Sequence, residues 1–149
     1  MPKKELTIDR CEEILDQAEV GYLAMSRDGQ PYCLPFNFVY DEGKIYIHTG
    51  VQGTKWDYIG DNASVCFTVA APGEKRTGES PCQYTYEFES VIVLGRASRV
   101  DSPEETADSL QKIIDKYRIA PVLPVPAEKM PKLRMIRIDI ERITGRQNL

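Results

Sequence analysis

Apolar residues recur at helical spacing in two parts of the chain. The first part follows Thr7, which can cap a helix, and its apolar positions are Ile8, Cys11, Ile14, Leu15 and Ala18. The second part follows Ser102, Pro103 and Glu105, which supply a capping side chain, a proline at the first helical position and a capping box. Its apolar positions are Leu110, Ile113, Ile114 and Tyr117. We therefore predict two peripheral helices, the first of which packs on a sheet.

Most of the remaining chain has the short apolar runs and turn residues of antiparallel strands. VGYLAMS, PYCLPFNFVY and KIYIHT, within residues 20–49, are joined by the turns RDGQ and DEG and predict a three-stranded meander. After a short helix expected between Gly53 and Asn62, SVCFTVA resumes the strand pattern, and residues 71–82 indicate a polar loop. YTYEFESVIVLGRASRV is too long for one flat strand, so we expect a bend or bulge near Glu89 or Gly95.

The C-terminal part combines a proline-rich linker with a last strand. Residues 119–131 contain four prolines, which exclude a helix or a central strand and predict an extended surface segment. RMIRIDIERI then alternates, with Ile136, Ile138 and Ile140 facing inward. Many short antiparallel strands with two peripheral helices predict a mainly β fold, a small closed or partly closed barrel without exposed edges. Residues 1–149 show no repeat and no sign of a second domain, so we expect one domain.

Composition narrows the class of protein. Hydrophobic residues make up 42% and charged residues 28% of the chain, as in ordinary globular proteins. The net charge of −4 opposes broad attraction to nucleic acid, which requires a clustered basic surface. No stretch approaches the roughly 18 apolar residues of a membrane span, and no apolar run follows the N-terminal lysines. We expect a cytoplasmic protein that binds neither membrane nor nucleic acid.

The cysteines do not indicate a metal site. Cys11, Cys33, Cys66 and Cys82 form no C-x-x-C pair, and the chain has one histidine, so we expect no bound metal and reduced thiols. Cys33 and Cys66 fall within predicted strands, where we expect both side chains to pack in the core.

Candidate chemistry is concentrated in IYIHTGVQGTKWDYI, residues 45–59, which contains the only histidine and the only tryptophan. Gly50 and Gly53 allow close backbone approach, and Thr54 and Lys55 at a helix start would direct N–H groups and a cation at an anion such as a phosphate. The spacing and the Thr-Lys order differ from those of a Walker A loop. From the residues alone a simpler interpretation stays open, in which His48 hydrogen-bonds a backbone group at a barrel rim and Lys55 is a solvated surface residue.

Three segments, from about Leu6 to Arg146, have the order and the spacings of a known family. They are EVGYLAMSRDGQPYCLPFNFVYDEGKIYIHTGVQGTKWDYIGDNASVCFTV, ESVIVLGRASRV and RIDIERITGR. In these segments the chain resembles the FMN-binding split-barrel family of pyridoxamine 5′-phosphate oxidase, most closely its branch related to nitroimidazole-resistance proteins. The resemblance implies a six-stranded antiparallel split barrel that forms a homodimer with FMN at the interface.

The resemblance also implies which residues contact the cofactor. The second predicted strand would lie along the isoalloxazine ring, largely through backbone groups of Pro35, Phe36, Asn37 and Phe38. The phosphate would be held by Thr54 and Lys55. The flavin would also be approached by His48 and Thr49 from the third strand and by Ser90 and Val91 from a later one. Core packing is the alternative role of Phe36, Phe38 and Val91.

The expected chemistry belongs to the flavin, with orientation and electrostatics supplied by the protein. Because the second strand reads CLPFNF and the chain ends at ITGRQNL, we do not expect vitamin B6 oxidation. We expect an FMN-dependent oxidoreductase that reduces a small acceptor, such as a nitroaromatic compound, with His48 donating a proton or a hydrogen bond to the substrate. The alternatives are a His48 that only packs against the ring edge, a flavin-binding or redox-sensing module without turnover, and a haem-binding split barrel with His48 as axial ligand.

Overall fold

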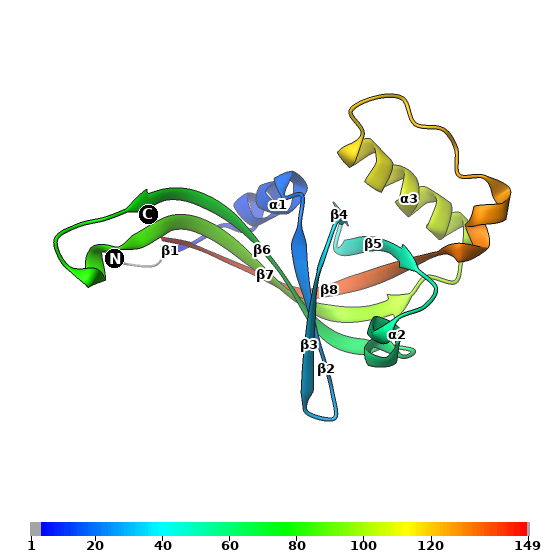
Figure 1. The fold of residues 1–149 in the computed structure, drawn as a ribbon, viewed down its shortest axis with the longest axis horizontal. Helices are drawn as coiled ribbons and strands as arrows, with labels where there is room; N and C mark the ends of the chain where they lie inside the picture. Colours follow the sequence, from blue (N-terminus) through cyan, green and yellow to red (C-terminus); the bar gives the residue numbers. More distant parts are fainter. Residues whose placement is uncertain (1–3, 149) are drawn as a thin grey trace.

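Strands make up most of the fold and pair into one antiparallel sheet (Figure 1). The computed structural model describes residues 4–148. In this part of the chain the sheet has eight strands in the order β3-β2-β6-β7-β8-β5-β4, with β1 paired to β8. The strands are β1 (Lys4–Glu5), β2 (Gly21–Arg27), β3 (Gln30–Phe36), β4 (Val39–Asp41), β5 (Lys44–Gly50), β6 (Ala63–Arg76), β7 (Thr85–Arg99) and β8 (Leu133–Asn148). The mainly β prediction is confirmed.

Eight strands replace the six that were expected, for two reasons. Lys4–Glu5 adds a short strand, and the segment predicted as one strand over residues 31–40 is split into β3 and β4. β3 pairs with β2 while β4 pairs with β5, so the two halves lie at opposite ends of the sheet order. No ladder of hydrogen bonds joins β3 to β4, so the two ends of the sheet are linked only by the backbone at Asn37 and Phe38.

The helices cover the ends and one flank of the barrel. They are α1 (Ile8–Gln17), α2 (Thr54–Ile59), α3 (Pro103–Tyr117) and the 3₁₀ helices η1 (Pro81–Gln83) and η2 (Ala127–Lys132). In Figure 1, α1 and α3 lie in the upper part of the molecule, and α2 lies below β5, to the right of the β2–β3 hairpin. No helix within residues 4–148 has the length and apolar character needed to cross a membrane.

Both predicted N-caps are confirmed. The Thr7 hydroxyl accepts a hydrogen bond from Arg10 N, and the Ser102 hydroxyl accepts one from Glu105 N, each at 3.2 Å. Glu105 does not supply the other half of the expected capping box, because its carboxylate instead accepts hydrogen bonds from Tyr46 and Arg137. This carboxylate ties the start of α3 to β5 and β8.

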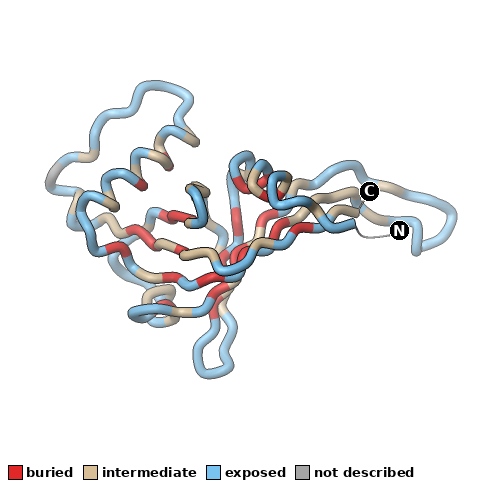
Figure 2. The backbone as a smooth tube through the Cα atoms, turned by 180° about the vertical axis from the view of Figure 1, so that it is seen from behind, coloured by how far each residue is buried: buried red, intermediate tan, exposed pale blue. Residues whose placement is uncertain are grey.

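The core fills the barrel, and Figure 2 shows buried residues concentrated where the strands cross. In β2, β6 and β7 buried residues alternate with more exposed ones. Its fully buried side chains include Leu23, Phe38, Phe67, Val69, Val91, Val93, Ile136 and Ile138. α1 closes one end through Cys11, Ile14 and Leu15, whereas Ile8, expected on the same face, is 54% exposed because it lies in the first turn, beyond the rim. Outside the barrel, Ile113 of α3 packs in a second cluster with Tyr46, Val100 and Met135.

The hairpin of β6 and β7 forms an arm, residues 71–89, that projects from the barrel in Figure 1. The prediction of a polar loop over residues 71–82 is wrong for its first half, because β6 continues to Arg76 and pairs with β7 as far as Thr85. The bulge expected near Gly95 is confirmed by a register shift between Leu94 and Gly95 in the β7–β8 ladder. A Cβ at Gly95 would lie 2.3 Å from the Asp139 carbonyl oxygen, so the close strand approach requires glycine.

The proline-rich linker forms neither helix nor strand over residues 118–126, but the expectation that no part of it is helical is wrong. Residues Ala127–Lys132 form η2, with Pro126 at the N-cap and Pro131 inside the helix. A short 3₁₀ turn needs few backbone donors, so it tolerates a proline that a longer α-helix would not.

Candidate functional site

The residues implied to bind a cofactor lie in three places. Pro35 and Phe36 end β3, and Asn37 and Phe38 form the junction between β3 and β4. His48 and Thr49 lie near the end of β5, followed by a loop and by Thr54 and Lys55 at the start of α2. Ser90 and Val91 lie on β7, at the base of the arm.

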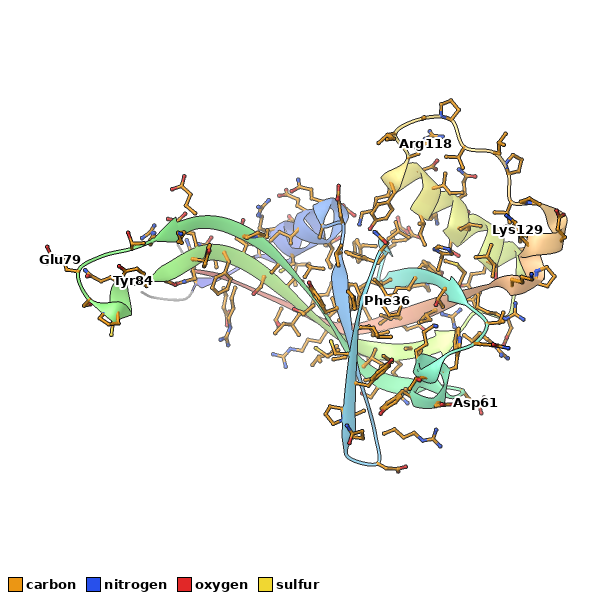
Figure 3. All side chains as sticks on the ribbon, in the orientation of Figure 1. Phe36, Asp61, Glu79, Tyr84, Arg118 and Lys129 are labelled. Atoms are coloured by element: carbon orange, nitrogen blue, oxygen red, sulfur yellow. The ribbon has the colours of Figure 1, made fainter. Side chains whose placement is uncertain are left out.

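The junction places exposed and buried side chains next to each other. Pro35 and Asn37 are exposed, Phe36 is half-buried, and Phe38 is fully buried, with its ring edge-on to Phe67 at 4.8 Å between centroids. Figure 3 labels Phe36 near the middle of the molecule, where β3 ends. The Phe38 side chain therefore has the core-packing role, and only its backbone can face a ligand.

β3 is an edge strand, and its prolines suit that place. Pro31 and Pro35 pair with Ser26 and Tyr22 of β2, so both lack an N–H that a further strand could use. Cys33 between them is exposed, which corrects the expectation of core packing. Its side chain points to the outer face of the sheet, in one row with Ala24 and Cys66.

Cys66 is the less accessible of these two thiols. It is partly exposed on the outer face rather than packed in the core as expected. Burial raises the pKa of Cys66, and the neighbouring Cys33 adds to the shift. Both sulfurs are thus surface features of the sheet, and the strand pattern alone did not reveal which face they occupy.

The loop between β5 and α2 has the backbone geometry that its glycines suggested. Gly53 has φ +130°, a conformation that side chains rarely allow, and a Cβ there would lie 3.1 Å from Lys55 Nζ. Gly50 has open space around it and no such constraint. Lys55 Nζ donates to the Gln52 carbonyl at 3.2 Å, and Trp56 Nε1 donates to the Gly50 carbonyl at 2.9 Å. The loop thus folds around the Lys55 ammonium, which keeps further donors for an anion.

Two arginines that the sequence did not single out lie near this loop. Arg134 is directly opposite Thr49 in the β5–β8 ladder. Arg99, at the end of β7, lines a cavity of about 200 Å³ together with Val51 and Trp56, and it pairs with Asp101 at 3.1 Å. The Arg134 guanidinium donates to the Pro131 and Leu133 carbonyls, at 3.2 and 2.8 Å. Only the pairing of strands far apart in the sequence brings these two arginines near the loop, so no local motif could have identified them.

His48 lies on the outer face of β5, opposite Met135, and its side chain is exposed. The β4–β5 ladder ends at the pair Val39–Tyr46, and Asn37 and Phe38 enter from the side on which His48 lies. The structure therefore brings the end of β5 and the β3–β4 junction together around one rim of the barrel.

Ser90 and Val91 lie elsewhere. Val91 is fully buried in the core, whereas Ser90 faces a groove of about 620 Å³ on the outer face of β7 and β8. The groove also contains Ile92 and Leu94, each 44% exposed, and the cations Arg142 and Arg146. Ser90 is nine residues from Arg99 along β7, which corresponds to about 30 Å of strand. One chain therefore does not gather all the implied residues around one small molecule.

The chemistry of the rim suits a flat anion. Lys55 supplies positive charge at the start of α2, and Arg99 lines the neighbouring cavity together with Trp56. Trp56 and Tyr58 are half-buried against the core, and the Tyr58 ring stacks on Tyr32 at 4.9 Å between centroids. The cavity beside Arg99 is too small for a dinucleotide or mononucleotide cofactor, whereas the groove beside Ser90 has the size of common cofactor sites.

A family model described as pyridoxamine 5′-phosphate oxidase matches residues 7–147. One curated relative, an uncharacterized protein of Rhizobium meliloti (strain 1021), is 25% identical over 88 residues, which are 59% of this chain and 51% of that protein. The match thus spans about half the length of that relative.

Solved structures have the same fold. A candidate 5-nitroimidazole antibiotic resistance protein from Bacteroides thetaiotaomicron has a TM-score of 0.81 at 24% identity, covering 99% of this chain and 89% of the other. A FAD-binding protein from Mesorhizobium loti has a TM-score of 0.72 at 24% identity over the full length of both chains. A candidate pyridoxamine 5′-phosphate oxidase from Corynebacterium glutamicum has a TM-score of 0.69 at 25% identity, covering 99% and 98%.

Proposed function

The chain belongs to the pyridoxamine 5′-phosphate oxidase family, and on that premise we propose that it is a flavoprotein that holds FMN between two copies of itself and reduces a small acceptor. The observation that carries the proposal is the division of the implied site. The ladders align Ile47, next to His48, through Ile136 with Arg99 at the end of β7, and Lys55 follows in α2. Ser90 lies about 30 Å of strand away from Arg99. A two-fold dimer would place the Ser90 groove of one chain against the Lys55 rim of the other.

The outer face of the sheet supports a dimer. Across β2, β6 and β7 it exposes Tyr22 to 50% and Ile92 and Leu94 to 44% each. Tyr22 and Ile92 lie in one row with Thr68 between them, and Leu94 lies in the next row on the same face. Large apolar side chains exposed together on a small protein mark a contact with another protein surface. A second copy would cover it and would complete a pocket that the groove only begins.

The residues present fit FMN. Lys55 would hold the phosphate, whose two negative charges an acidic chain must balance locally. The backbone of residues 35–38 would lie along the flat ring, and a bound flavin would supply the redox centre. The structural relative from Mesorhizobium loti is described as FAD-binding, which supports a flavin and makes FAD the competitor to be tested.

His48 is the residue that we assign to the substrate. Its imidazole is exposed at the rim and reaches solvent on the same side as the junction. An imidazole there can donate a hydrogen bond or a proton to an acceptor that is being reduced. A His48→Ala variant that retains FMN but loses turnover of a nitroaromatic probe would support this role, and unchanged turnover would show that His48 takes no part in the reaction.

The phosphate contact is tested by comparing FMN with riboflavin, which lacks the phosphate. In Lys55→Met we expect FMN affinity to fall about 10- to 100-fold, the value of a hydrogen bond to a charged group, while riboflavin affinity is unchanged. Lys129→Met, which removes an exposed lysine of η2, is the matched control. Equal loss for both ligands, or equal effects of both variants, would contradict the assignment.

Mixing two defective chains tests the shared site. Lys55→Met impairs the rim, and Ser90→Phe fills the groove, so neither homodimer should bind FMN tightly. A mixed dimer has one site with both residues intact, so an equimolar mixture should regain about a quarter of the sites. No recovery in a mixture shown to contain mixed dimers would refute a site built from two chains.

A further inference from the structure

The last turn of α3 crosses the split in the barrel and binds the chain on both sides of it. Lys116 Nζ donates to the carbonyl oxygens of Ala18 at 2.6 Å, Phe38 at 3.0 Å and Leu15 at 3.4 Å. The ammonium also lies 3.9 Å from the centroid of the Phe38 ring. One side chain thus joins the end of α1 to the β3–β4 junction.

Tyr117 completes the same set of contacts. Its hydroxyl accepts a hydrogen bond from Phe38 N at 3.0 Å and donates to the Glu19 carbonyl at 2.7 Å. The Phe38 carbonyl, at 2.9 Å, is a second acceptor within reach. Because a hydroxyl has one proton and Lys116 already serves Phe38, the consistent assignment gives that proton to Glu19. Asn37 Nδ2 also donates to the Glu19 carbonyl, at 3.2 Å.

These contacts replace the pairing that the sheet does not provide. The ladder of β3 with β2 ends at Phe36, and the ladder of β4 with β5 begins at Val39. Phe38 lies between them with a fully buried side chain, and buried backbone groups must find partners. Its N–H and its C=O both find them on α3, 78 and 79 residues away in the sequence.

Two of the carbonyls that Lys116 contacts end a helix. Leu15 and Ala18 lie at the C-terminal end of α1, where the last carbonyls have no helical partner and the helix dipole favours a cation. Asp16 and Glu19 face the ammonium from the same segment and favour its charged form, opposing the burial that disfavours it. The net effect is a lowered pKa of Lys116, and three carbonyl oxygens around Nζ fix the position of its side chain.

We propose that Lys116 and Tyr117 are positioning residues, which hold residues 36–38 in the one placement that can lie along the flavin ring. This inference rests on the proposed function, since it is FMN that the junction would contact. If the junction without these contacts is correctly placed only a tenth of the time, the apparent dissociation constant of FMN rises tenfold, because only the competent fraction binds.

Tyr117→Phe tests the proposal, with Tyr46→Phe as its control. Tyr46 also ties α3 to the barrel through its hydroxyl, which donates to Glu105 at 2.7 Å, but that bond lies at the start of α3. We expect amide exchange of Phe38 in the FMN-free protein to become at least tenfold faster in Tyr117→Phe and FMN to bind about tenfold more weakly. Tyr46→Phe should change neither by more than about twofold.

Lys116→Met supplies a second pair with Lys112→Met. Lys112 lies one turn earlier on α3 and contacts Asp41 at 2.6 Å and Asp108 at 3.0 Å, away from the junction. Weaker FMN binding and a broadened bound-flavin spectrum in Lys116→Met alone would support the proposal. Equal weakening by both members of either pair would show a general stability effect and would overturn it.

These experiments separate the positioning role of Lys116 and Tyr117 from the proposed binding of FMN. If Phe38 exchange is unchanged in Tyr117→Phe, the positioning role is wrong whether or not FMN binds. If exchange accelerates but FMN affinity stays the same, the contacts hold the junction and the flavin does not need it. If the unaltered protein binds no FMN, the proposed function fails, and with it the role of these residues toward a flavin.

Discussion

Gly21 is the position at which the smallest change should do the most damage. A Cβ built on Gly21 would lie 2.0, 2.4 and 2.9 Å from three atoms at the tip of the Phe67 ring. Ordinary van der Waals contact begins at 3.4 Å, so the nearest ring atom would have to move by 3.4 − 2.0 = 1.4 Å. Phe67 is fully buried and held edge-on by Phe38, so the ring has no free space to enter.

We expect Gly21→Ala to lower the free energy of unfolding by about 3 kcal/mol, the upper part of the range for overpacked cores. Urea unfolding followed by Trp56 fluorescence would measure the change as a lower midpoint at a constant slope. Gly50→Ala is the matched control, since nothing lies within 4 Å of its Cβ. It should change the stability by less than about 0.5 kcal/mol.

A double mutant tests the cause of the loss. Phe67→Leu shortens the ring and should cost about 1 to 2 kcal/mol alone, through the cavity that it leaves. With the ring gone, Gly21→Ala should cost at least about 1 kcal/mol less than in the unaltered protein. Additive effects, or a Gly21→Ala variant as stable as Gly50→Ala, would refute the contact as the reason for glycine.

Three further predictions concern pH and one buried hydroxyl. The Tyr46 hydroxyl and Arg137 hold the pKa of the Glu105 carboxyl below 4.5, so the ionised carboxylate stabilises the fold above that pH and this stabilisation is lost as pH falls through the lowered pKa. In urea titrations between pH 5 and 3, Glu105→Gln should reduce the acid-dependent loss in the free energy of unfolding by roughly 1 kcal/mol. Burial lowers the pKa of Lys116 from 10.5 to about 8, so between these two pH values the unfolded chain binds more protons at this side chain than the folded chain does. The free energy of unfolding should therefore rise by about 1 to 2 kcal/mol across this pH range, and Lys116→Met should abolish the rise. Within residues 4–148 the buried Ser98 hydroxyl has no hydrogen-bond partner, so Ser98→Ala should raise the stability by about 1 kcal/mol, and a loss in thermal unfolding would contradict this.

Local rules predicted the parts of the fold that depend on near neighbours. The caps of α1 and α3, the short α2 and the alternation of Ile136 and Ile138 in β8 follow from residues within one turn or one strand. The bulge at Gly95 also has a local cause, because a long β segment with one glycine must bend.

The division of residues 31–40 into two strands could not be predicted in this way. PYCLPFNFVY has the composition of one strand, and the break at Phe38 depends on the side chains of Lys116 and Tyr117. The arm was missed for a different reason. Residues 73–80 are glycine or polar and have no strand pattern of their own, and the ladder between β6 and β7, with the Arg76–Glu87 ion pair, extends β6 as far as Arg76.

Only the part of the candidate site around Gly53 and Lys55 could be predicted from the sequence. Gly53 and Lys55 form a loop whose geometry follows from four consecutive residues. Arg99 and Arg134 join that loop through strand pairing, and the separation of Ser90 from it follows from the length of β7. Sequence reasoning could therefore propose the contacts but not their distribution over two ends of the barrel.

Sedimentation velocity recorded at the visible absorbance of the flavin would show whether two chains hold the flavin between them. After reconstitution with FMN, we expect the yellow colour to sediment with a particle of about 34 kDa, twice the chain mass of 16.9 kDa. Flavin that stays behind a folded protein, or that travels with a single chain of 16.9 kDa, would contradict it.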